Sequence, residues 1–147
     1  MISNKKIFIT GGAGFIGSTL IASLIEFNDV VIYDNFTRNS IKNKSYANHP
    51  NLTIVHGDIL DLNDLTQAIQ GSNIVIHAAA IAGIDTTIRH PVQTMTVNMV
   101  GTYNVLEAAR TLPKLERLVE FSTSEVFGTK AYKVSESTTA VTGAVGE

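Results

Sequence analysis

A glycine-rich segment near the start of the chain has the residue types and spacing of a phosphate-binding turn. Residues Thr10–Gly17 read TGGAGFIG, which satisfies both the GxGxxG and the GxxGxxG patterns. A glycine at the turn permits positive φ, Gly14 lets the backbone approach a pyrophosphate without a Cβ, and Gly17 lets a following helix lie close to the preceding strand. Free N–H groups and the positive end of that helix then meet the phosphates, unless the turn serves packing alone. The residues expected to contact the pyrophosphate are Gly11, Gly14, Phe15, Ile16 and Gly17.

An acidic residue at a matching distance favours a dinucleotide as the ligand. Asp34 ends a second apolar run, 20 residues past Gly14, where a carboxylate that accepts hydrogen bonds from the adenosine ribose hydroxyls is expected. A carboxylate there repels a 2′-phosphate, so NAD is favoured over NADP, although Arg38 is a nearby cation that would favour NADP. We place Asn35 in the same cofactor-binding set. The alternative for Asp34 is a residue that forms a turn at the end of a strand.

Short apolar runs bounded by Gly, Asn or Asp predict the strands that position these residues. The runs are continuously apolar, so both faces of their sheet must be covered, which favours a parallel sheet with helices on each side. The predicted strands are Lys6–Thr10, Val30–Tyr33, Leu52–His56, Asn73–His77 and Leu118–Phe121. Apolar periodicity predicts helices at Phe15–Phe27, at Leu62–Ile69 after Asp61, and at about Pro91–Arg110. This alternation predicts an α/β fold, a doubly wound Rossmann sheet with strand order 3-2-1-4-5.

Length and composition exclude several other classes of protein. A chain of 147 residues, 44% apolar and 16% charged, is expected to form one domain over residues 1–147 with a substantial core. A formal charge of -2 without a basic run makes nucleic acid an unexpected partner. The absence of cysteine excludes disulfides and thiolate metal sites, so we expect no metal and a cytoplasmic location. The first apolar run, Ile7–Thr10, is too short for a signal peptide or a membrane span, and no membrane partner is expected.

Six motifs in order give the chain a family resemblance over Lys5–Gly128. They are Thr10–Gly17, Asp34-Asn35-Phe36, Gly57-Asp58-Ile59, His77-Ala78-Ala79-Ala80, Asn98-Met99-Val100-Gly101-Thr102 and Ser122-Thr123-Ser124-Glu125-Val126-Phe127-Gly128. With these motifs the chain resembles the extended short-chain dehydrogenases/reductases, and within them the NAD-dependent nucleotide-sugar epimerase/dehydratase group. Six ordered motifs are far more specific than any one of them.

The resemblance implies roles for residues that follow the third and fourth predicted strands. Asp58 and Ile59 would flank the adenine, the acid accepting from the exocyclic amine while the aliphatic side chain covers the ring. Their alternative is an acid that opens a helix and a core isoleucine. Ala78, Ala79 and Ala80 would let the dinucleotide cross the carboxyl edge of the sheet, where the alternative is tight packing between helix and sheet.

Two polar residues of these motifs have competing interpretations. By the resemblance, Asn98 would hydrogen-bond the backbone or a water behind the nicotinamide ribose, whereas a simple surface asparagine is the alternative. His77 is interpreted as a strand-end residue with satisfied hydrogen bonds and not as a catalyst.

The catalytic candidates follow the fifth predicted strand. The resemblance places Ser122 beside the nicotinamide and Thr123 against the reacting sugar hydroxyl. Ser124 and Glu125 match a pair that assists proton movement in the dehydratase and decarboxylase branches, although epimerases with this run also occur. The alternative is an ordinary polar exit from a strand.

The implied reaction begins with hydride transfer from C4 of a nucleotide-sugar to NAD, which gives a 4-keto intermediate with acidified neighbours. The family supplies the base as Tyr in a Tyr-x-x-x-Lys pair, in which the ammonium lowers the pKa of the phenol. The fourth residues after the tyrosines of this chain are Thr37, Pro50, Glu107 and Glu136. We therefore expect the N-terminal part of an enzyme about twice as long, able to bind NAD and inactive alone. Apolar surface left by the absent substrate-binding part predicts a homo-oligomer.

Two other functions compete with this interpretation. A non-catalytic NAD(P)-binding regulator of the same fold would need no Tyr-x-x-x-Lys pair, but it would have no evident use for Thr123 and Glu125. A steroid- or flavonol-type reductase of the same extended family would usually require NADP, for which Asp34 is poorly suited.

Overall fold

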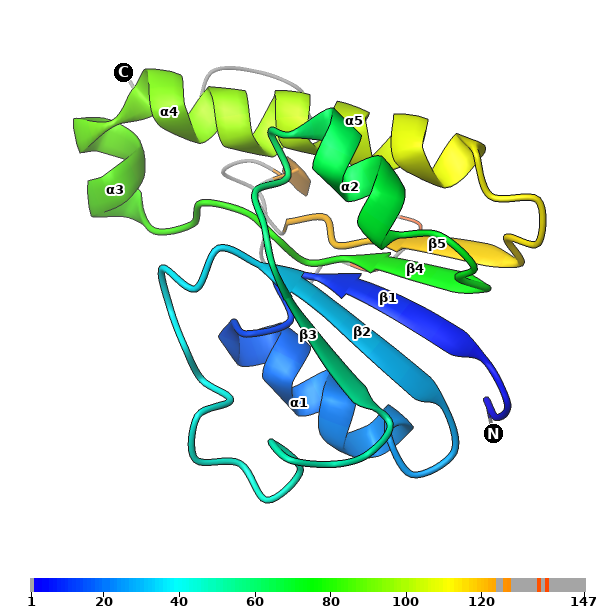
Figure 1. Cartoon of the computed structure of the whole chain (residues 1–147). Coiled ribbons are helices and arrows are strands. Elements are labelled where there is room, and N and C mark those ends of the chain that lie inside the picture. Colours follow the sequence, from blue (N-terminus) through cyan, green and yellow to red (C-terminus); the bar gives the residue numbers. More distant parts are fainter. Residues whose placement is uncertain (1, 124–125, 128–134, 136, 138–147) are drawn as a thin grey trace.

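The computed structural model describes residues 2–123, 126–127, 135 and 137, and these residues form a five-stranded parallel sheet. Its order is β3-β2-β1-β4-β5, which confirms the predicted doubly wound topology. The strands are β1 (Lys6–Thr10), β2 (Asp29–Asp34), β3 (Leu52–His56), β4 (Ile74–His77) and β5 (Arg117–Glu120). All neighbouring strands pair in parallel, so their carboxyl ends share one edge, toward the left of Figure 1. The strand order reverses beside β1, where a ligand of such a sheet binds.

The helices largely follow the predicted segments, with two differences. They are α1 (Phe15–Leu24), α2 (Leu62–Ala68), α3 (Ile84–Arg89), α4 (Pro91–Met95), the π-helical turn η1 (Thr96–Val100) and α5 (Gly101–Arg110). The short helix α3 was not predicted from the sequence, because six residues with a single i, i+4 pair of isoleucines are too short a pattern to identify a helix. The predicted helix over 91–110 is interrupted by η1, which places one wide turn in its middle.

Helices and loops cover both faces of the sheet, as continuously apolar strands require. Alternate residues of β1 enter two cores: Ile7 and Ile9 pack on the face covered by α1, and Phe8 packs on the face covered by α2 and α5 (Figure 1). The segment between β2 and β3 contributes Ile41 and Tyr46 to the first core. The central strands β1, β2 and β4 are therefore buried, whereas the edge strands β3 and β5 are only partly covered, and the glycine turn starts from the most central strand.

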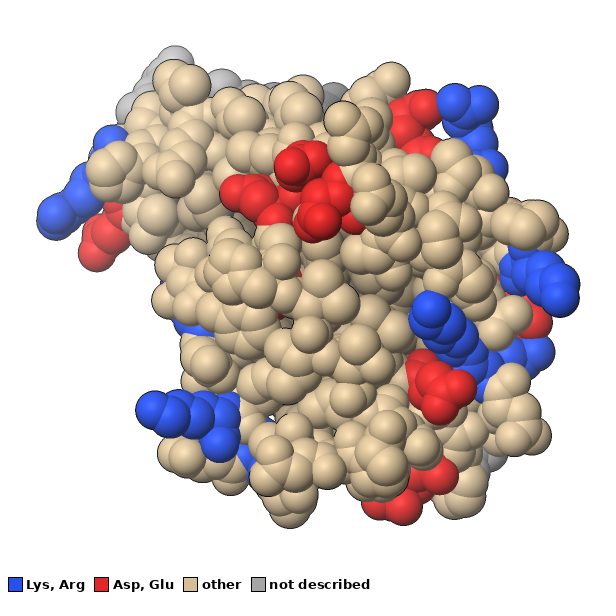
Figure 2. All heavy atoms as spheres, in the orientation of Figure 1, with Lys and Arg blue, Asp and Glu red and all other residues tan. Residues whose placement is uncertain are grey.

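The surface seen in Figure 2 carries scattered charges of both signs. Most lysine and arginine side chains lie near the rim, several of them beside acidic side chains, and a group of acidic side chains lies beside α2 (Figure 2). Within the described residues, no helix is both long and apolar enough to span a bilayer.

Candidate functional site

The glycine turn joins β1 to α1 at the centre of the carboxyl edge. Gly11 has φ 69°, and its N–H donates to the carbonyl oxygen of Tyr33 at 3.0 Å, which ties the turn to β2. A Cβ at Gly11 would lie 2.6 Å from the backbone nitrogen of Ala79, and a Cβ at Gly17 would lie 2.7 Å from Cα of Gly12. Both positions therefore need glycine so that backbone segments can pack closely.

Gly14 differs from these two glycines because the space beside it is open. A Cβ there would meet only the carbonyl oxygen of Gly11, at 3.1 Å. Gly14 is the extended N-cap of α1, and its carbonyl accepts the first helical bond, from the N–H of Ser18 at 3.0 Å. The N–H groups of Phe15 and Ile16 precede that bond, so they have no partner within the helix, and both residues are exposed. This combination suits an anion such as a pyrophosphate.

Asp34 ends β2 beside the turn, as predicted, and its carboxylate makes two bonds that the sequence did not reveal. Oδ2 accepts from the N–H of Ala13 at 2.9 Å, and Oδ1 accepts from the N–H of Phe36 at 2.8 Å. Phe36 has φ 57°, and the N–H of Ser40 donates to the carbonyl of Ala13 at 2.8 Å. The acid thus joins the glycine turn to the segment that follows β2. Each oxygen accepts one of these bonds and keeps capacity for a second donor, such as a ribose hydroxyl.

The other residue of the cofactor-binding set after β2 is occupied locally. Oδ1 of Asn35 accepts from the N–H of Thr37 at 3.1 Å and from its hydroxyl at 2.8 Å. Asn35 is exposed at the same edge, and a contact with the cofactor stays a prediction.

Asp58 and Ile59 follow β3 but differ in exposure. Asp58 is exposed, and its Oδ1 accepts from the N–H of Leu60 at 2.9 Å. Ile59 is 6% exposed and belongs to the core under α5, where a Cβ on Gly101 would overlap its side chain. Asp61, not Asp58, caps α2, by accepting from the N–H of Asp64 at 3.0 Å. Asp58 is therefore free to accept from an adenine amine, and the place of Ile59 against the ring stays a prediction.

Tyr33 lies beneath this segment, and its burial keeps its hydroxyl protonated. Its hydroxyl donates to Oδ2 of Asp64 at 2.7 Å and lies 3.0 Å from the carbonyl oxygen of Asp58. Burial, and then the hydrogen bond to Asp64, raise the pKa of Tyr33 far above its ordinary value. The phenol therefore stays protonated and does not act as a base at neutral pH.

The segment after β4 lies directly against the glycine turn. The N–H of Ala78 donates to the carbonyl oxygen of Thr10 at 3.1 Å, and Ala79 is the neighbour that Gly11 accommodates. Ala78 and Ala79 are half-buried and Ala80 is exposed, so these small side chains line the edge without filling it. The dinucleotide role of all three stays a prediction, which this geometry supports.

Asn98 holds the same segment from η1. Its Oδ1 accepts from the N–H of Ile81 at 2.8 Å, and its Nδ2 donates to the carbonyl oxygen of Ile81 at 2.9 Å. Both ends of the side-chain amide therefore bond the backbone of Ile81, and a place behind the nicotinamide ribose stays a prediction. The π-helical turn that positions Asn98 was missed. An asparagine in mid-helix, followed by the buried Gly101, was the available signal.

The catalytic candidates lie where β5 ends, with part of the set outside the described residues. β5 pairs with β4, with Glu120 opposite His77, so Ser122 and Thr123 follow at the same edge as the alanine segment. Both are exposed. Ser124 and Glu125 lie outside the described residues.

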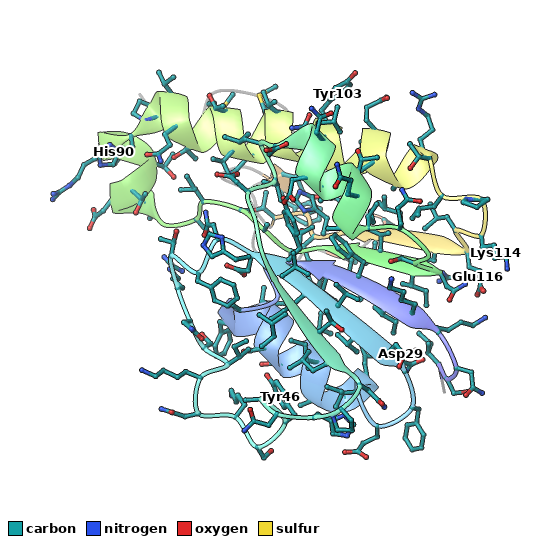
Figure 3. The ribbon with its side chains drawn as sticks, in the orientation of Figure 1. Asp29, Tyr46, His90, Tyr103, Lys114 and Glu116 are labelled. Atoms are coloured by element: carbon teal, nitrogen blue, oxygen red, sulfur yellow. The ribbon has the colours of Figure 1, made fainter. Side chains whose placement is uncertain are left out.

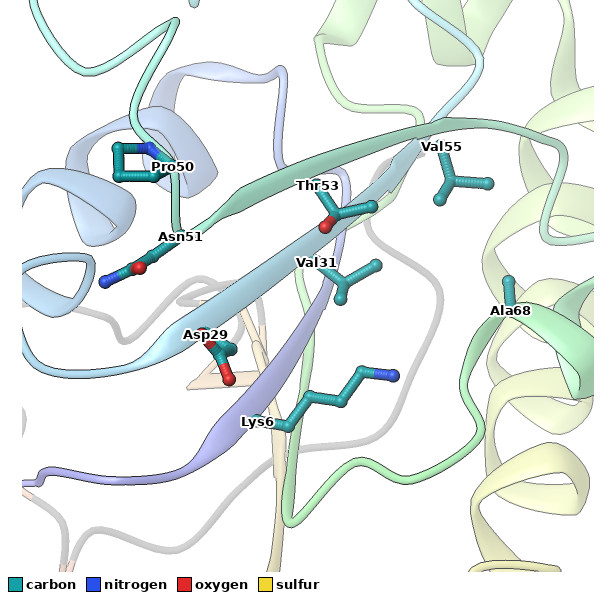
Figure 4. Close-up of a pocket in the computed structure, with 8 residues that line it drawn as sticks. All are labelled: Lys6, Asp29, Val31, Pro50, Asn51, Thr53, Val55 and Ala68. Carbon is teal, nitrogen blue, oxygen red and sulfur yellow. The ribbon is translucent and has the colours of Figure 1, made fainter.

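A pocket at the opposite edge of the sheet is unrelated to these residues. It has a volume of 370 Å³ and is lined by residues of β1, β2 and β3, by the two residues before β3, and by Ala68 at the end of α2 (Figure 4). Lys6 lies in it and donates to the carbonyl oxygen of Gln70 at 2.7 Å, and Asp29 is the ladder partner of Lys6 on β2. Because ligands of doubly wound sheets bind at the carboxyl edge, we assign no cofactor to this pocket.

The sheet, the glycine turn and the acid at the end of β2 define a dinucleotide-binding Rossmann domain. Residues 7–144 match the model of the NAD dependent epimerase/dehydratase family, and the chain belongs to this family. The residues present fit NAD, the family's cofactor: Gly14 beside open space, N–H groups without partners in the first turn of α1, and the carboxylate of Asp34 at the end of β2. Solved relatives hold NAD, among them a Bordetella bronchiseptica enzyme 35% identical to this chain, with TM-score 0.69.

Individual relatives span several reactions on nucleotide-sugars. The chain is 35% identical over 144 residues to UDP-N-acetyl-alpha-D-glucosaminuronate decarboxylase of Bacillus cytotoxicus, covering 97% of this chain and 44% of that protein. It is 33% identical over 143 residues to CDP-paratose 2-epimerase of Salmonella typhi, covering 93% and 42%. A solved UDP-N-acetylglucosamine 4-epimerase of Methanobrevibacter ruminantium is 29% identical with TM-score 0.85, covering 95% and 45%. The chain thus spans less than half the length of these relatives.

Proposed function

We propose that this chain is the cofactor-binding part of an NAD-dependent nucleotide-sugar epimerase, dehydratase or decarboxylase that acts through a 4-keto intermediate. The observation that carries the proposal is the glycine turn, in which Gly14 stays open beside free helical N–H groups while Asp34 stands across the edge. Relatives named as all three kinds of enzyme support this range of reactions.

The described residues bind and orient the cofactor in this proposal. N–H groups at the start of α1 hold the pyrophosphate, and Asp34 accepts from the adenosine ribose hydroxyls. Asp58 accepts from the adenine amine. Ala78 and Ala79 leave room for the dinucleotide to cross toward β5. NAD, when bound, accepts hydride from C4 of the sugar and later returns it.

Residues after β5 meet the sugar in this proposal. Ser122 lies by the nicotinamide, and Thr123 hydrogen-bonds the reacting hydroxyl and fixes its direction toward the cofactor. Ser124 and Glu125 assist proton movement, with Glu125 favouring the dehydratase and decarboxylase branches. Relatives are named as members of both branches and also as epimerases, so all three reactions stay within the proposal.

The isolated 147-residue chain binds NAD and converts no sugar in this proposal. These 147 residues contain no Tyr-x-x-x-Lys pair, the pair expected to supply the base in this family.

A homo-oligomer is part of the same proposal, with its interface on the helical segment formed by α4, η1 and α5. An apolar stripe runs along its outer face, and Tyr103 projects from α5 away from the sheet (Figure 3). The exposed fractions are 78% for Val92, 56% for Met95, 61% for Met99, 58% for Tyr103 and 48% for Leu106. A continuous apolar stripe of this kind marks a protein interface.

Calorimetric titration of the 147-residue chain with NADH tests the proposal. We expect saturable binding that Gly14→Leu weakens at least about tenfold, because the side chain enters the space reserved for the pyrophosphate. Ala22→Leu is the control, since it places the same leucine side chain at an exposed position of α1 away from the turn. Absence of binding to folded wild-type chain, or equal binding by Gly14→Leu, would contradict the proposal.

A further inference from the structure

A buried histidine links three backbone segments that meet at the candidate cofactor site. His77 ends β4 and is 2% exposed. Its Nδ1 lies 2.5 Å from Oγ1 of Thr10, and its Nε2 lies 3.1 Å from Oγ1 of Thr102. Thr10 directly precedes the glycine turn, and Thr102 lies on α5 one turn after Asn98.

The two threonines continue the connection to backbone groups. Oγ1 of Thr10 accepts from the N–H of Ala79 at 3.4 Å. Oγ1 of Thr102 donates to the carbonyl oxygen of Asn98 at 2.7 Å. The amide of Asn98 in turn holds both backbone groups of Ile81. One polar chain therefore runs from the segment after β4, through the ring, to the π-helical turn that holds the same segment.

Hydrogen counting decides the direction of this chain. Burial lowers the pKa of His77 to about 4, so the ring is neutral at pH 7 and carries one N–H. The carbonyl of Asn98 can only accept, so it takes the single hydroxyl hydrogen of Thr102, whose oxygen must then accept from the ring. Nε2 is thereby the protonated nitrogen, and Nδ1 accepts from the hydroxyl of Thr10.

The opposite tautomer leaves a buried group unsatisfied. With Nδ1 protonated, the ring would donate to Oγ1 of Thr10. The hydroxyl hydrogen of Thr10 would then have to point away from the ring, toward another acceptor. Thr10 is 0% exposed, and its hydroxyl has no other acceptor among the contacts of the described residues. A buried donor without a partner costs free energy, so the Nε2–H tautomer is selected.

We propose that His77 is a positioning residue whose Nε2–H tautomer, fixed between Thr10 and Thr102, holds the Ala78–Ile81 segment against the glycine turn for cofactor binding. The ring touches neither the substrate nor the cofactor in this role. The binding part of the inference rests on the proposed function, whereas the tautomer does not.

Nitrogen-15 spectra of the histidine rings in the full 147-residue chain test the tautomer directly. We expect His77, at pH 7.5, to show an acceptor-type Nδ1 and a protonated Nε2, with the signal assigned by its loss in His77→Asn. A protonated Nδ1, or averaging between tautomers, would overturn the proposal. This measurement needs no variant of the two threonines to fold.

Variants of Thr102 test positioning. Thr102→Val removes the acceptor of Nε2–H, and we expect faster amide exchange at Ile81 and NADH binding weaker by about fivefold or more. Thr102→Ser should restore both. Thr66→Val is the matched control, because Thr66 donates to the i−4 carbonyl of Leu62 at 2.6 Å in the same way but contacts no histidine.

The outcomes separate the inference from the proposed function. A folded Thr102→Val chain with unchanged Ile81 exchange, or with unchanged NADH affinity in a wild type that binds, would overturn the positioning role. Lack of NADH binding by the wild-type chain refutes the proposed function and the role of His77 in cofactor binding. The tautomer spectrum then still tests the hydrogen-bond chain from Thr10 through His77 to Thr102. If Thr102→Val does not fold, rescue by Thr102→Ser and the wild-type tautomer decide.

Discussion

Removing the carboxylate of Asp34 should destabilise the chain even without any cofactor. Asp34→Ala leaves the N–H groups of Ala13 and Phe36 without the acceptors that they have at 2.9 and 2.8 Å. Ala13 is 0% exposed, so water does not readily replace the lost acceptor there. A hydrogen bond to a charged group contributes roughly 1.5 to 3 kcal/mol, and Asp34 is half-buried, so we expect a loss of about 2 to 4 kcal/mol for the pair.

Thermal unfolding followed by circular dichroism, with no dinucleotide present, measures this loss. For a domain of this length the change corresponds to a fall in Tm of roughly 4 to 16 °C. The Tm of Asp34→Asn should fall less than that of Asp34→Ala, because the amide oxygen of the asparagine still accepts from one N–H while its NH2 group faces the other. Asp85→Ala, at an exposed position of α3, is the control. A Tm of Asp34→Ala within about 2 °C of wild type would refute the bridging role and return Asp34 to ribose recognition alone.

Three further predictions concern stability and assembly. The pKa of His77 falls from 6.5 to about 4 on folding, so its neutral form stabilises the fold fully above pH 6.5, and this contribution, about 3 kcal/mol, is lost between pH 6.5 and 4. Urea unfolding at pH 7.5 and 5 should show that the free energy of unfolding depends less on pH in His77→Gln than in wild type. An equal pH dependence in the two proteins would contradict this prediction. Gly11→Ala combines φ 69° with a Cβ 2.6 Å from the nitrogen of Ala79, so its Tm should drop by more than about 5 °C, which a thermal melt can disprove. Sedimentation velocity should show wild-type chain as a dimer or larger and Met99→Glu/Tyr103→Glu as a monomer, and a monomeric wild type would exclude the stripe as an interface.

The sequence predicted the sheet well because its signals are local. Each strand is a short apolar run between turn residues. β1 and β3 have the predicted bounds, β4 starts one residue later, β2 extends one residue further at each end, and β5 is shifted by one residue toward the N-terminus. The order 3-2-1-4-5 then follows from the handedness of parallel connections. The glycine turn and Asp34 were found for the same reason, since their spacing along the chain is itself the signal.

The features that the sequence did not reveal depend on contacts between distant residues. Asp34 meets Ala13, 21 positions earlier, and His77 meets Thr10 across 67 positions. No local pattern encodes which buried donor faces which acceptor, and the same is true of the π-helical turn, which forms where Asn98 reaches Ile81. Buried polar groups must find partners, so a buried histidine predicts that partners exist without identifying them.

The four glycines of one motif can be divided by what a side chain would meet. Side chains at Gly11, Gly12 and Gly17 would enter the alanine segment, Ile32 and the turn itself, so packing alone requires these glycines. That requirement would hold in a turn that binds nothing.

Gly14 is the position at which packing gives the weakest reason for glycine, because a Cβ would meet one carbonyl oxygen at 3.1 Å and otherwise open space. The spacing of the glycines alone cannot separate a turn that only packs from a turn that binds a ligand. The difference between Gly14 and the other three glycines can be used to separate them. Substitution at Gly11 should lower stability first, whereas substitution at Gly14 should remove NADH binding at little cost in Tm. If instead Gly14→Leu unfolds the chain and the wild-type chain binds no NADH, the open space beside α1 has no ligand. The glycine motif then serves the fold alone.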